Sequence, residues 1–183
     1  RKMPMRFWAC TCFEHTTMFA AVLERLGYDV TRRLGRVGDP ALAGRTHAVT
    51  VGWGGSMFHA QDWPGINDQL AAVVRSRADV GLHMVGADYT AGLADRVTGW
   101  SDHHTYHRAL DFHIGIAPVA ETPFNRCKSF LRALEYAARG IPVVASDSLA
   151  YRGFVEHGVT GFLVRYDHEW SRYLRDLVHD AAM

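Results

Sequence analysis

The pattern of apolar and polar positions predicts alternating strands and helices, most clearly in the middle of the chain. Residues 112–118 form an apolar run that ends in proline, and residues 121–126 are polar with a second proline, which indicates a loop. Residues 128–139 carry apolar side chains at helical spacing, and Gly140 follows as a typical helix-ending residue. Residues 141–146 form a second short apolar run, rich in valine. This order predicts a βαβ unit with parallel strands.

The same alternation extends on both sides of this unit. From residue 48 onward we expect six strands separated by helices, which predicts an α/β fold with a Rossmann-like, doubly wound parallel sheet. Right-handed crossovers place the loops that follow the strands at one edge of such a sheet, and ligands bind at that edge. Outside the central unit, the pattern predicts strands at 48–53, 80–85, 97–100 and 161–164 and helices at 64–74, 89–96, 102–110, 151–157 and 168–182.

The first 47 residues differ from the rest of the chain. Residues 1–31 carry a short βαβ-like pattern that is too small to be a domain, and residues 32–47 contain three glycines and a proline, which is typical of a linker. We therefore expect the main domain to comprise residues 48–183. The lead segment, residues 1–47, holds eight Lys/Arg and four Asp/Glu. A basic segment of this kind is typical of a solvated face, or of a surface that contacts a membrane or an acceptor.

Composition and charge exclude several classes of protein. The 183 residues are 48% hydrophobic with a formal net charge of +1, which fits a globular protein with one good core and does not indicate nucleic acid as a partner. No apolar run approaches the roughly 18 residues of a transmembrane helix, and no signal-peptide pattern opens the chain. The three cysteines, Cys10, Cys12 and Cys127, favour a reducing compartment over a disulfide framework. We expect a cytoplasmic location, with a peripheral membrane contact left open.

The loop and helix of the central unit carry the candidate chemistry. Asn125 is a good N-cap residue, and the first turn of the helix that it would begin presents backbone N–H groups that favour an anion such as phosphate. Lys128 adds a positive charge at that end, and Lys2 is the only other lysine in the sequence. Glu135 lies further on, on nearly the same helical face and roughly 10 Å along the axis. This separation is about the span from a diphosphate to a ribose.

The spacing of the charges also fits a solvated helix surface. The charged positions recur at i, i+4, i+7 and i+11, and they are Lys128, Arg132, Glu135 and Arg139. Arg132–Glu135 and Glu135–Arg139 would then be ordinary surface ion pairs. Spacing alone leaves both interpretations open.

Two further features are weaker signals. Gly54 and Gly55, after the first predicted strand, permit close backbone approach to a ligand, although a plain tight turn explains them equally well. His103 and His107 lie on one face of a predicted helix, and two histidines at i, i+4 can hold a metal. The sequence lacks an HExxH pattern and an obvious third ligand, so we expect no metal site.

Three stretches, PFNRCKS, LEYAARGIPVVASD and EHGVTGFLV, lie in this order within residues 121–164. They resemble the donor-binding half of GT-B glycosyltransferases of the group 1, or family 4, kind. The resemblance implies that Glu135, five residues before the helix-ending glycine, binds the donor ribose and that Lys128 stabilises the leaving phosphate. Cys127 stands where the family usually has a second glutamate, which holds the donor sugar, so the resemblance assigns no sugar contact to that position.

The resemblance also implies which other residues face the donor. The loop after the first strand would face the phosphates, with two glycines as a backbone cradle and Ser56 and His59 as side chains within reach. Trp100 would either stack on the base or pack half-buried. The expected donor-binding residues are therefore Gly54, Gly55, Ser56, His59, Trp100, Asn125, Lys128, Ser129 and Glu135.

We therefore expect the nucleotide-sugar-binding domain of a retaining, metal-independent glycosyltransferase of the hexosyltransferase type. Its substrate would be a UDP- or GDP-linked sugar, with no cofactor and no metal. Positioned N–H groups together with Lys128 would stabilise the departing diphosphate. The acceptor, whether a saccharide, a lipid or a protein, is left open.

The lead segment and two alternative functions complete these expectations. Residues 1–31 resemble the last unit of the first GT-B domain, which implies that the isolated chain is incomplete and binds donor with negligible transfer. An exposed strand edge leaves a homodimer through the lead segment open. Two other functions fit the same residues: a non-catalytic module that binds a nucleotide or a partner protein, and a GT-B sugar-nucleotide epimerase.

Overall fold

The structure, a computed structural model, describes residues 48–99 and 102–181. The expected N-terminal remnant (1–31), the linker (32–47) and Trp100 lie outside the described residues, as do the side chains of residues 103–105. The division of the chain at residue 48 therefore stays a prediction.

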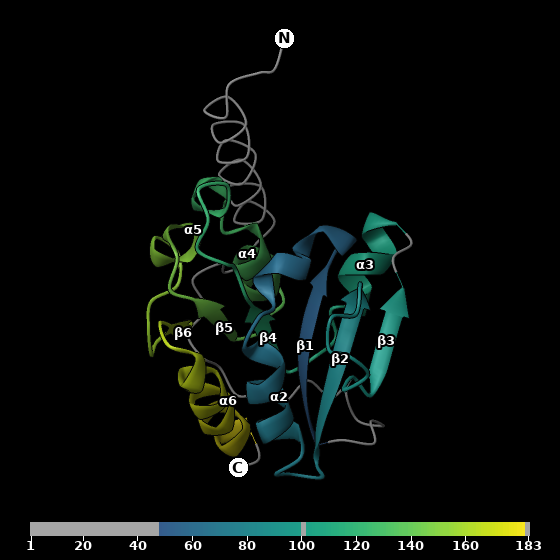
Figure 1. The fold of residues 1–183 in the computed structure, drawn as a ribbon. Helices are drawn as coiled ribbons and strands as arrows, with labels where there is room; N and C mark the ends of the chain where they lie inside the picture. Colours follow the sequence, from purple (N-terminus) through teal and green to yellow (C-terminus); the bar gives the residue numbers. More distant parts are fainter. Residues whose placement is uncertain (1–47, 100–101, 182–183) are drawn as a thin grey trace.

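Within the described residues, six strands form one sheet in which every neighbouring pair is parallel. Their order across the sheet is β3-β2-β1-β4-β5-β6 (Figure 1). This doubly wound, Rossmann-like arrangement confirms the predicted fold class. The strands are β1 Val49–Gly55, β2 Val80–Gly86, β3 Arg96–Gly99, β4 Ile114–Ala117, β5 Val143–Ser146 and β6 Gly161–Val164.

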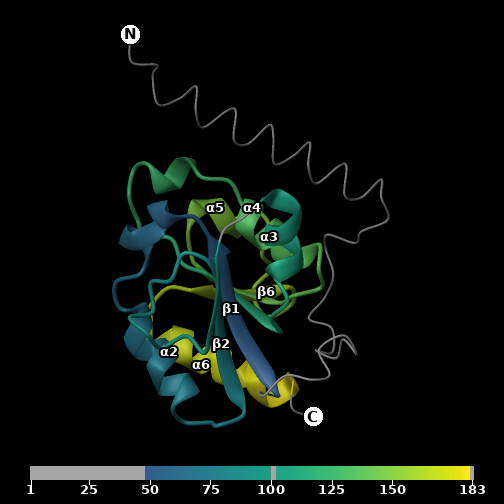
Figure 2. The ribbon, with the colours of Figure 1, turned by 90° about the vertical axis from the view of Figure 1, so that its right-hand side faces the viewer.

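Helices cover both faces of the sheet (Figures 1 and 2). Helices α2 and α6 lie side by side on one face, where Leu70 and Leu174 are fully buried in a core cluster. Helices α3, α4 and α5 pack on the other face, around a second cluster that contains Tyr136 and Tyr151. The bounds are α2 Ile66–Val74, α3 His103–Ala109, α4 Leu131–Ala137, α5 Leu149–Arg152 and α6 Asp167–Ala181, with the 3-10 helices η2 Met57–Asp62 and η3 Asn125–Cys127.

The central strand β1 shows how its sequence serves both faces. Val51 and Trp53 are buried in the cluster that faces α2 and α6. Because successive side chains of a strand alternate between faces, Gly52 between them faces the other cluster. A Cβ atom on Gly52 would lie 2.0 Å from the ring of Phe112. The glycine therefore makes room for an aromatic ring in the second core.

One predicted helix is wrong. The pattern predicts a helix over residues 89–96, but the structure has a turn there. The Asp88 carboxylate accepts hydrogen bonds from the backbone N–H and the hydroxyl of Thr90, at 2.8 and 2.6 Å. Ala91 and Gly92 then have φ angles of 53° and 85°. Residues in the left-handed region cannot continue a right-handed helix.

The helix of the central unit begins later than its spacing predicts. Helix α4 begins at Leu131, and the backbone of Lys128 is extended, with a ψ angle of 152°. Asn125 is therefore not the N-cap of this helix, which corrects the prediction. The side-chain amide of Asn125 donates to Asp62 Oδ1 and to the carbonyl of Ala120, each at 2.8 Å. These two bonds draw the side chain into the interior, away from the capping position.

The other predicted elements occur close to their expected positions. The predicted helix stop at Gly140 is confirmed by its φ angle of 69°. The helix expected over residues 151–157 is displaced, since α5 begins at Leu149 and ends at Arg152.

Candidate functional site

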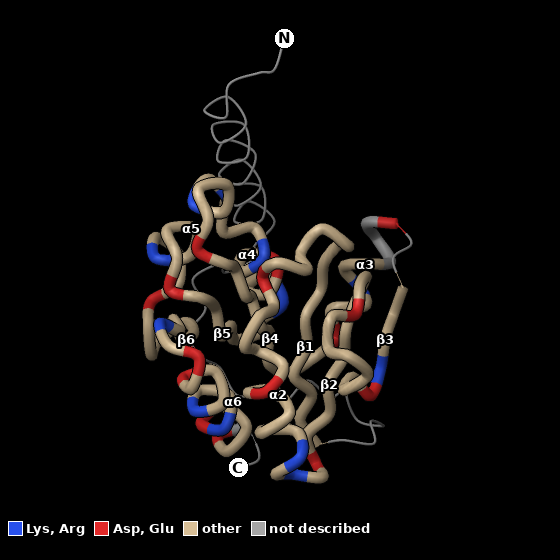
Figure 3. The backbone as a smooth tube through the Cα atoms, in the orientation of Figure 1, with Lys and Arg blue, Asp and Glu red and all other residues tan. Residues whose placement is uncertain are grey.

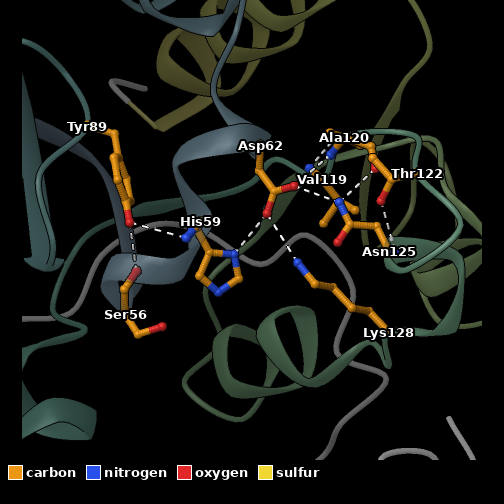
Figure 4. Close-up of polar contacts among 10 residues, drawn as sticks. Ser56, His59, Asp62, Tyr89, Val119, Ala120, Thr122, Asn125 and Lys128 are labelled. Carbon is orange, nitrogen blue, oxygen red and sulfur yellow. Dashed lines mark hydrogen bonds and ion pairs between the residues drawn. The ribbon is translucent and has the colours of Figure 1, made fainter. Parts of the chain in front are cut away.

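The loops that follow β1 and β4 meet at the carboxyl edge of the sheet. Strand order reverses between these two strands, and ligands bind at such reversal points in doubly wound sheets. Asp62, at the end of η2, joins the two loops (Figure 4). Its buried carboxylate accepts hydrogen bonds from the backbone N–H of Ala120 at 2.9 Å and from the side-chain amide of Asn125 at 2.8 Å. One buried carboxylate thus ties the β1 loop to the β4 loop.

Two basic side chains complete this arrangement. Lys128 Nζ lies 3.2 Å from Asp62 Oδ2, and His59 Nδ1 lies 2.9 Å from the same oxygen. We call His59, Asp62, Asn125 and Lys128 the Asp62 cluster, and Figure 4 shows the Lys128 side chain reaching from its loop to the carboxylate. The side chains of Lys128 and His59 are each 22% exposed. The basic side of the cluster is therefore accessible from the solvent.

The pKa of Asp62 is lowered to about 2. Burial by itself raises the pKa, but hydrogen bonds from His59 and Ala120 and the charge of Lys128 outweigh burial. At neutral pH the side chain is therefore a carboxylate and a very weak base. A general base works best when its pKa lies near the working pH, so the geometry suits Asp62 to holding Lys128 rather than to accepting a proton.

Tyr89 holds the segment between β1 and η2. Its hydroxyl donates to the carbonyl of Ser56 at 3.0 Å and accepts from the backbone N–H of His59 at 3.2 Å (Figure 4). The side chain of Ser56 is exposed. The structure thus brings Ser56 and His59 to the edge that carries Lys128.

Gly54 and Gly55 are buried, and the protein's own side chains occupy the space beside them. A Cβ atom on Gly54 would lie 2.5 Å from Leu110 Cδ2. A Cβ atom on Gly55 would lie 2.5 Å from the Trp53 ring and 2.8 Å from Arg132 Nη2. Packing within the fold accounts for both glycines, and their role as a phosphate cradle stays a prediction.

Glu135 belongs to a second group of polar side chains, centred on α4. The hydroxyl of Tyr106 donates to Glu135 Oε2 at 3.3 Å, and Arg132 Nη1 lies 3.6 Å from the same oxygen. Arg132 also donates to the Tyr106 hydroxyl at 2.5 Å and stacks over Trp53, 5.3 Å from the ring centroid. The side chains of Glu135 and Arg132 are 11% and 16% exposed. The predicted pair therefore exists, but it is not the solvated surface pair that spacing alone suggests.

Tyr106 donates to Glu135 under all ordinary conditions. Burial raises the pKa of Tyr106 to about 12, against the opposing charge of Arg132. The phenol therefore stays protonated and fixes the orientation of the Glu135 carboxylate.

Lys128 and Glu135 do not lie on one helical face, because Lys128 precedes α4 in an extended segment. Ser129, the next residue, is half-buried in the same segment. Cys127, at the end of η3, is exposed. Contact of a single ligand with both Lys128 and Glu135 stays a prediction, and Trp100 lies outside the described residues.

Three general properties of the described residues bear on function. Lys and Arg positions alternate with Asp and Glu positions along the backbone of the described residues (Figure 3). In residues 48–99 and 102–181, no group of three or more His, Cys, Asp and Glu side chains is placed to hold a metal ion. No helix in the same part of the chain is long and apolar enough to cross a membrane.

Sequence reasoning missed Asp62 and treated Arg132 only as a surface charge. No local spacing pairs Asp62 with Lys128, because the two residues are 66 positions apart. The available signal was topological. The loops after β1 and β4 meet where strand order reverses, so an acidic side chain in the first loop is a natural partner for the single lysine of the second.

Comparison with known proteins identifies the family. The family model for glycosyl transferases group 1 matches residues 48–180. By contrast, no curated protein matches the chain by sequence.

Two solved structures are similar to this chain at low sequence identity. A crystal structure of accessory secretory protein 1, 2 and 3 in Streptococcus pneumoniae is similar with a TM-score of 0.51 and 13% identity, over 85% of this chain and 32% of that chain. A glycosylation-associated protein (Gap123) complex from Streptococcus agalactiae is similar with a TM-score of 0.46 and 12% identity, over 85% and 36%. The first likeness shows the fold alone, and this chain spans about a third of that protein.

The family model covers nearly all of the described residues, and the sheet has the architecture that the family resemblance implies. Family membership supports a glycosyltransferase-type function. The chain belongs to the group 1 glycosyl transferases.

Proposed function

We propose that this chain is the donor domain of a retaining, metal-independent glycosyltransferase of the hexosyltransferase type, binding a UDP- or GDP-linked sugar. One observation carries the proposal: an ammonium group, Lys128 Nζ, is fixed by a buried carboxylate where strand order reverses, in a chain of this family. In sheets of this type, ligands bind at that point.

Lys128 is suited to stabilise a departing nucleoside diphosphate. The ammonium group has three N–H donors, and the contact with Asp62 uses one of them. A preorganised cation at the leaving group lowers the barrier without reorganisation at the moment of reaction. In this way Lys128 supplies charge that a metal ion supplies in other transferases.

Glu135 is the residue that we assign to the ribose. Tyr106 and Arg132 both contact its Oε2 oxygen, so Oε1 is the oxygen that we assign to the ribose hydroxyls. A carboxylate held in this way accepts hydrogen bonds from two neighbouring hydroxyl groups with little further loss of side-chain conformational entropy. The donor would then extend from the β4 loop across α4.

The Asp62 carboxylate favours a second candidate, a non-catalytic nucleotide- or partner-binding module. Asp62 is itself an anion, and it already accepts from Lys128, His59, Asn125 and the N–H of Ala120. In a module of this kind these donors would serve the fold. Cys127, where the family usually has a glutamate, fits the same interpretation.

Calorimetry with UDP, GDP and ADP, each with and without EDTA, separates a donor domain from a partner-binding module. For a donor domain we expect either UDP or GDP to bind, and to bind with the same affinity in the presence of EDTA. Binding that disappears with EDTA contradicts metal independence. Absence of binding for all three nucleotides favours a non-catalytic module that binds a partner protein rather than a nucleotide.

A further inference from the structure

A cavity of about 510 Å³ opens at the carboxyl ends of β4, β5 and β6, beside Asp62 and the first residues of the loop that carries Lys128. The loops that follow these three strands form its walls, together with η2 and the start of α6. The side chains that the argument uses are Asp62, Asp147, Ser148, Arg152, Arg165 and Tyr166. Nothing in the proposed donor site uses the last five of these residues.

Asp147 organises the basic side chains of the cavity. Arg152 donates through Nε to Asp147 Oδ1 at 2.6 Å and through Nη2 to Oδ2 at 3.0 Å. Arg165 donates to Oδ2 through both Nε and Nη2, at 3.2 Å. The arginine side chains are 53% and 67% exposed, whereas that of Asp147 is 9% exposed. Arg152 Nη2 also donates to the backbone carbonyl of Asp147 at 3.3 Å, and much of both guanidinium groups is open to the solvent.

Ser148 supplies an independent sign of a missing partner. The residue is 5% exposed, and its hydroxyl has no hydrogen-bond partner among the described residues. Ser148 occupies the N-cap position of α5, where serine usually bonds to the backbone, but its side chain makes no such bond. A buried hydroxyl without a partner is unfavourable, and Ser148 is one of the residues that line the cavity.

The balance of charge in the walls favours a neutral polyhydroxyl ligand over an ion. Asp62 is paired with Lys128, and Glu121, which also lines the cavity, is paired with Arg126. The two arginines of the cavity are balanced by Asp147 and by Asp167, a further lining carboxylate. A sugar hydroxyl donates to a carboxylate and accepts from a guanidinium at the same time. The Tyr166 side chain, 59% exposed at the rim, offers an apolar face for the C–H side of a sugar ring.

We propose that this cavity binds a saccharide, through Ser148, Asp147, Arg152 and Arg165, and that the saccharide is the acceptor. Asp62 separates the cavity from Lys128, since it lines the cavity and contacts the lysine. A sugar hydroxyl bound beside Asp62 would then be close to the ammonium group that we assign to the leaving diphosphate. The acceptor role rests on the proposed donor function, whereas saccharide binding does not.

The test is an NMR titration of the isotopically labelled chain with the methyl glycosides of glucose, galactose, mannose and N-acetylglucosamine, followed by UDP and GDP in the same samples. We expect at least one glycoside to shift the signals of Ser148 and of the Arg152 and Arg165 side chains. Arg165→Gln should weaken that glycoside about tenfold. The matched control is Arg75→Gln, an exposed arginine at the end of α2, which should leave its affinity unchanged.

Ser148→Ala gives a second test, in which glycoside affinity and the free energy of unfolding are measured on the same variant. If the hydroxyl serves a ligand, the variant binds the glycoside more weakly while its free energy of unfolding stays equal or rises, because an unpaired buried group is removed. Failure of all four glycosides, equal weakening by Arg75→Gln, or a stronger response to inorganic phosphate overturns the proposal. Nucleotide shifts without glycoside shifts overturn this inference alone, and the reverse result overturns the donor proposal alone.

Discussion

Asp62 and Asp147 are both carboxylates at the carboxyl edge of the sheet, and each accepts from two basic side chains. Hydrogen bonds from those partners hold the pKa of both below the ordinary value. Their surroundings differ. The Asp62 side chain is fully buried with partners that are 22% exposed, whereas the partners of Asp147 are 53% and 67% exposed.

The difference shows that burial, more than the number of partners, decides what such a carboxylate does. Two unit charges 4 Å apart interact by about 1 kcal/mol in water and by about 4 kcal/mol near a protein surface with an effective dielectric of about 20. The contacts of Asp62 are therefore strong and permanent, and they fix Lys128. The contacts of Asp147 are weak enough to be exchanged for those of a ligand.

Removal of the two carboxylates gives the largest expected contrast. Asp62→Ala should lower the free energy of unfolding by about 3–5 kcal/mol, because it leaves Lys128 and the amide of Asn125 without their buried acceptor. Asp147→Ala should lower it by about 1 kcal/mol or less, since its partners are solvated. Urea unfolding followed by circular dichroism measures both. Equal effects for the two variants would contradict the comparison.

Nucleotide binding should sharpen the assignment of Lys128. Lys128→Ala should weaken UDP or GDP by about 10- to 150-fold, the equivalent of the 1.5–3 kcal/mol of a charge-assisted contact, and should spare the free nucleoside. Arg126→Ala is the matched control, since this neighbouring cation is 57% exposed and pairs with Glu121. Titration calorimetry provides the affinities. A loss shared equally by nucleoside and diphosphate would mean that Lys128 acts only through the fold.

The pH dependence of stability should reveal a contribution of about 2 kcal/mol from Asp62. The pKa of Asp62 lies at about 2 in the folded protein against an ordinary value of 3.8, so the folded state favours the ionised form. The resulting stabilisation is fully present above about pH 4 and is lost as the pH falls through 2. We expect Asp62→Asn to lose less stability than the unaltered chain over this range, in urea unfolding at several pH values.

Salt separates the contribution of Asp147 within the same experiment. Its pKa is lowered chiefly by the hydrogen bond from Arg152, so its contribution has the same sign of pH dependence. The exposed arginines are screened at about 1 M salt, and this part should shrink there. A pH response of the Asp62→Asn variant that is as steep as that of the unaltered chain would contradict the assignment.

The inner strands β1, β2, β4 and β5 could be predicted from sequence because they are almost wholly buried, and parallel strands covered on both faces have continuous apolar sequence. The run at the edge strand β6 also matches its predicted bounds, Gly161–Val164, although Phe162 and Leu163 are only half-buried. The helix predicted over residues 89–96 failed because Ala91 adopts a left-handed backbone, which apolar spacing does not reveal.

The candidate site could be predicted only in part. Lys128 and Glu135 followed from a local motif, but their partners come from distant segments: Asp62 is 66 positions from Lys128, and Tyr106 is 29 positions from Glu135. Asn125 shows the same limit, because a good capping residue is bound instead to Asp62. The local capping propensity of a residue predicts its position poorly where a buried charge requires hydrogen-bond donors.

The substitution of Glu135 has the smallest expected effect and is the most specific test. The Glu135 side chain is 11% exposed, which lies between the buried side chain of Asp62 and the exposed arginine partners of Asp147. Glu135→Gln keeps the shape of the side chain and an acceptor oxygen but removes the charge, so the bonds from ribose hydroxyls should weaken by about 1 kcal/mol, or roughly fivefold in affinity. A 2′,3′-dideoxy nucleotide lacks those hydroxyls and should bind both forms alike. Glu156→Gln, at an exposed glutamate, is the control and should change neither affinity.

Calorimetry with the ribonucleotide and its 2′,3′-dideoxy analogue tests the assignment of Glu135 to the ribose. Equal weakening of both nucleotides would show that Glu135 serves only Tyr106 and Arg132, and the ribose assignment would fail.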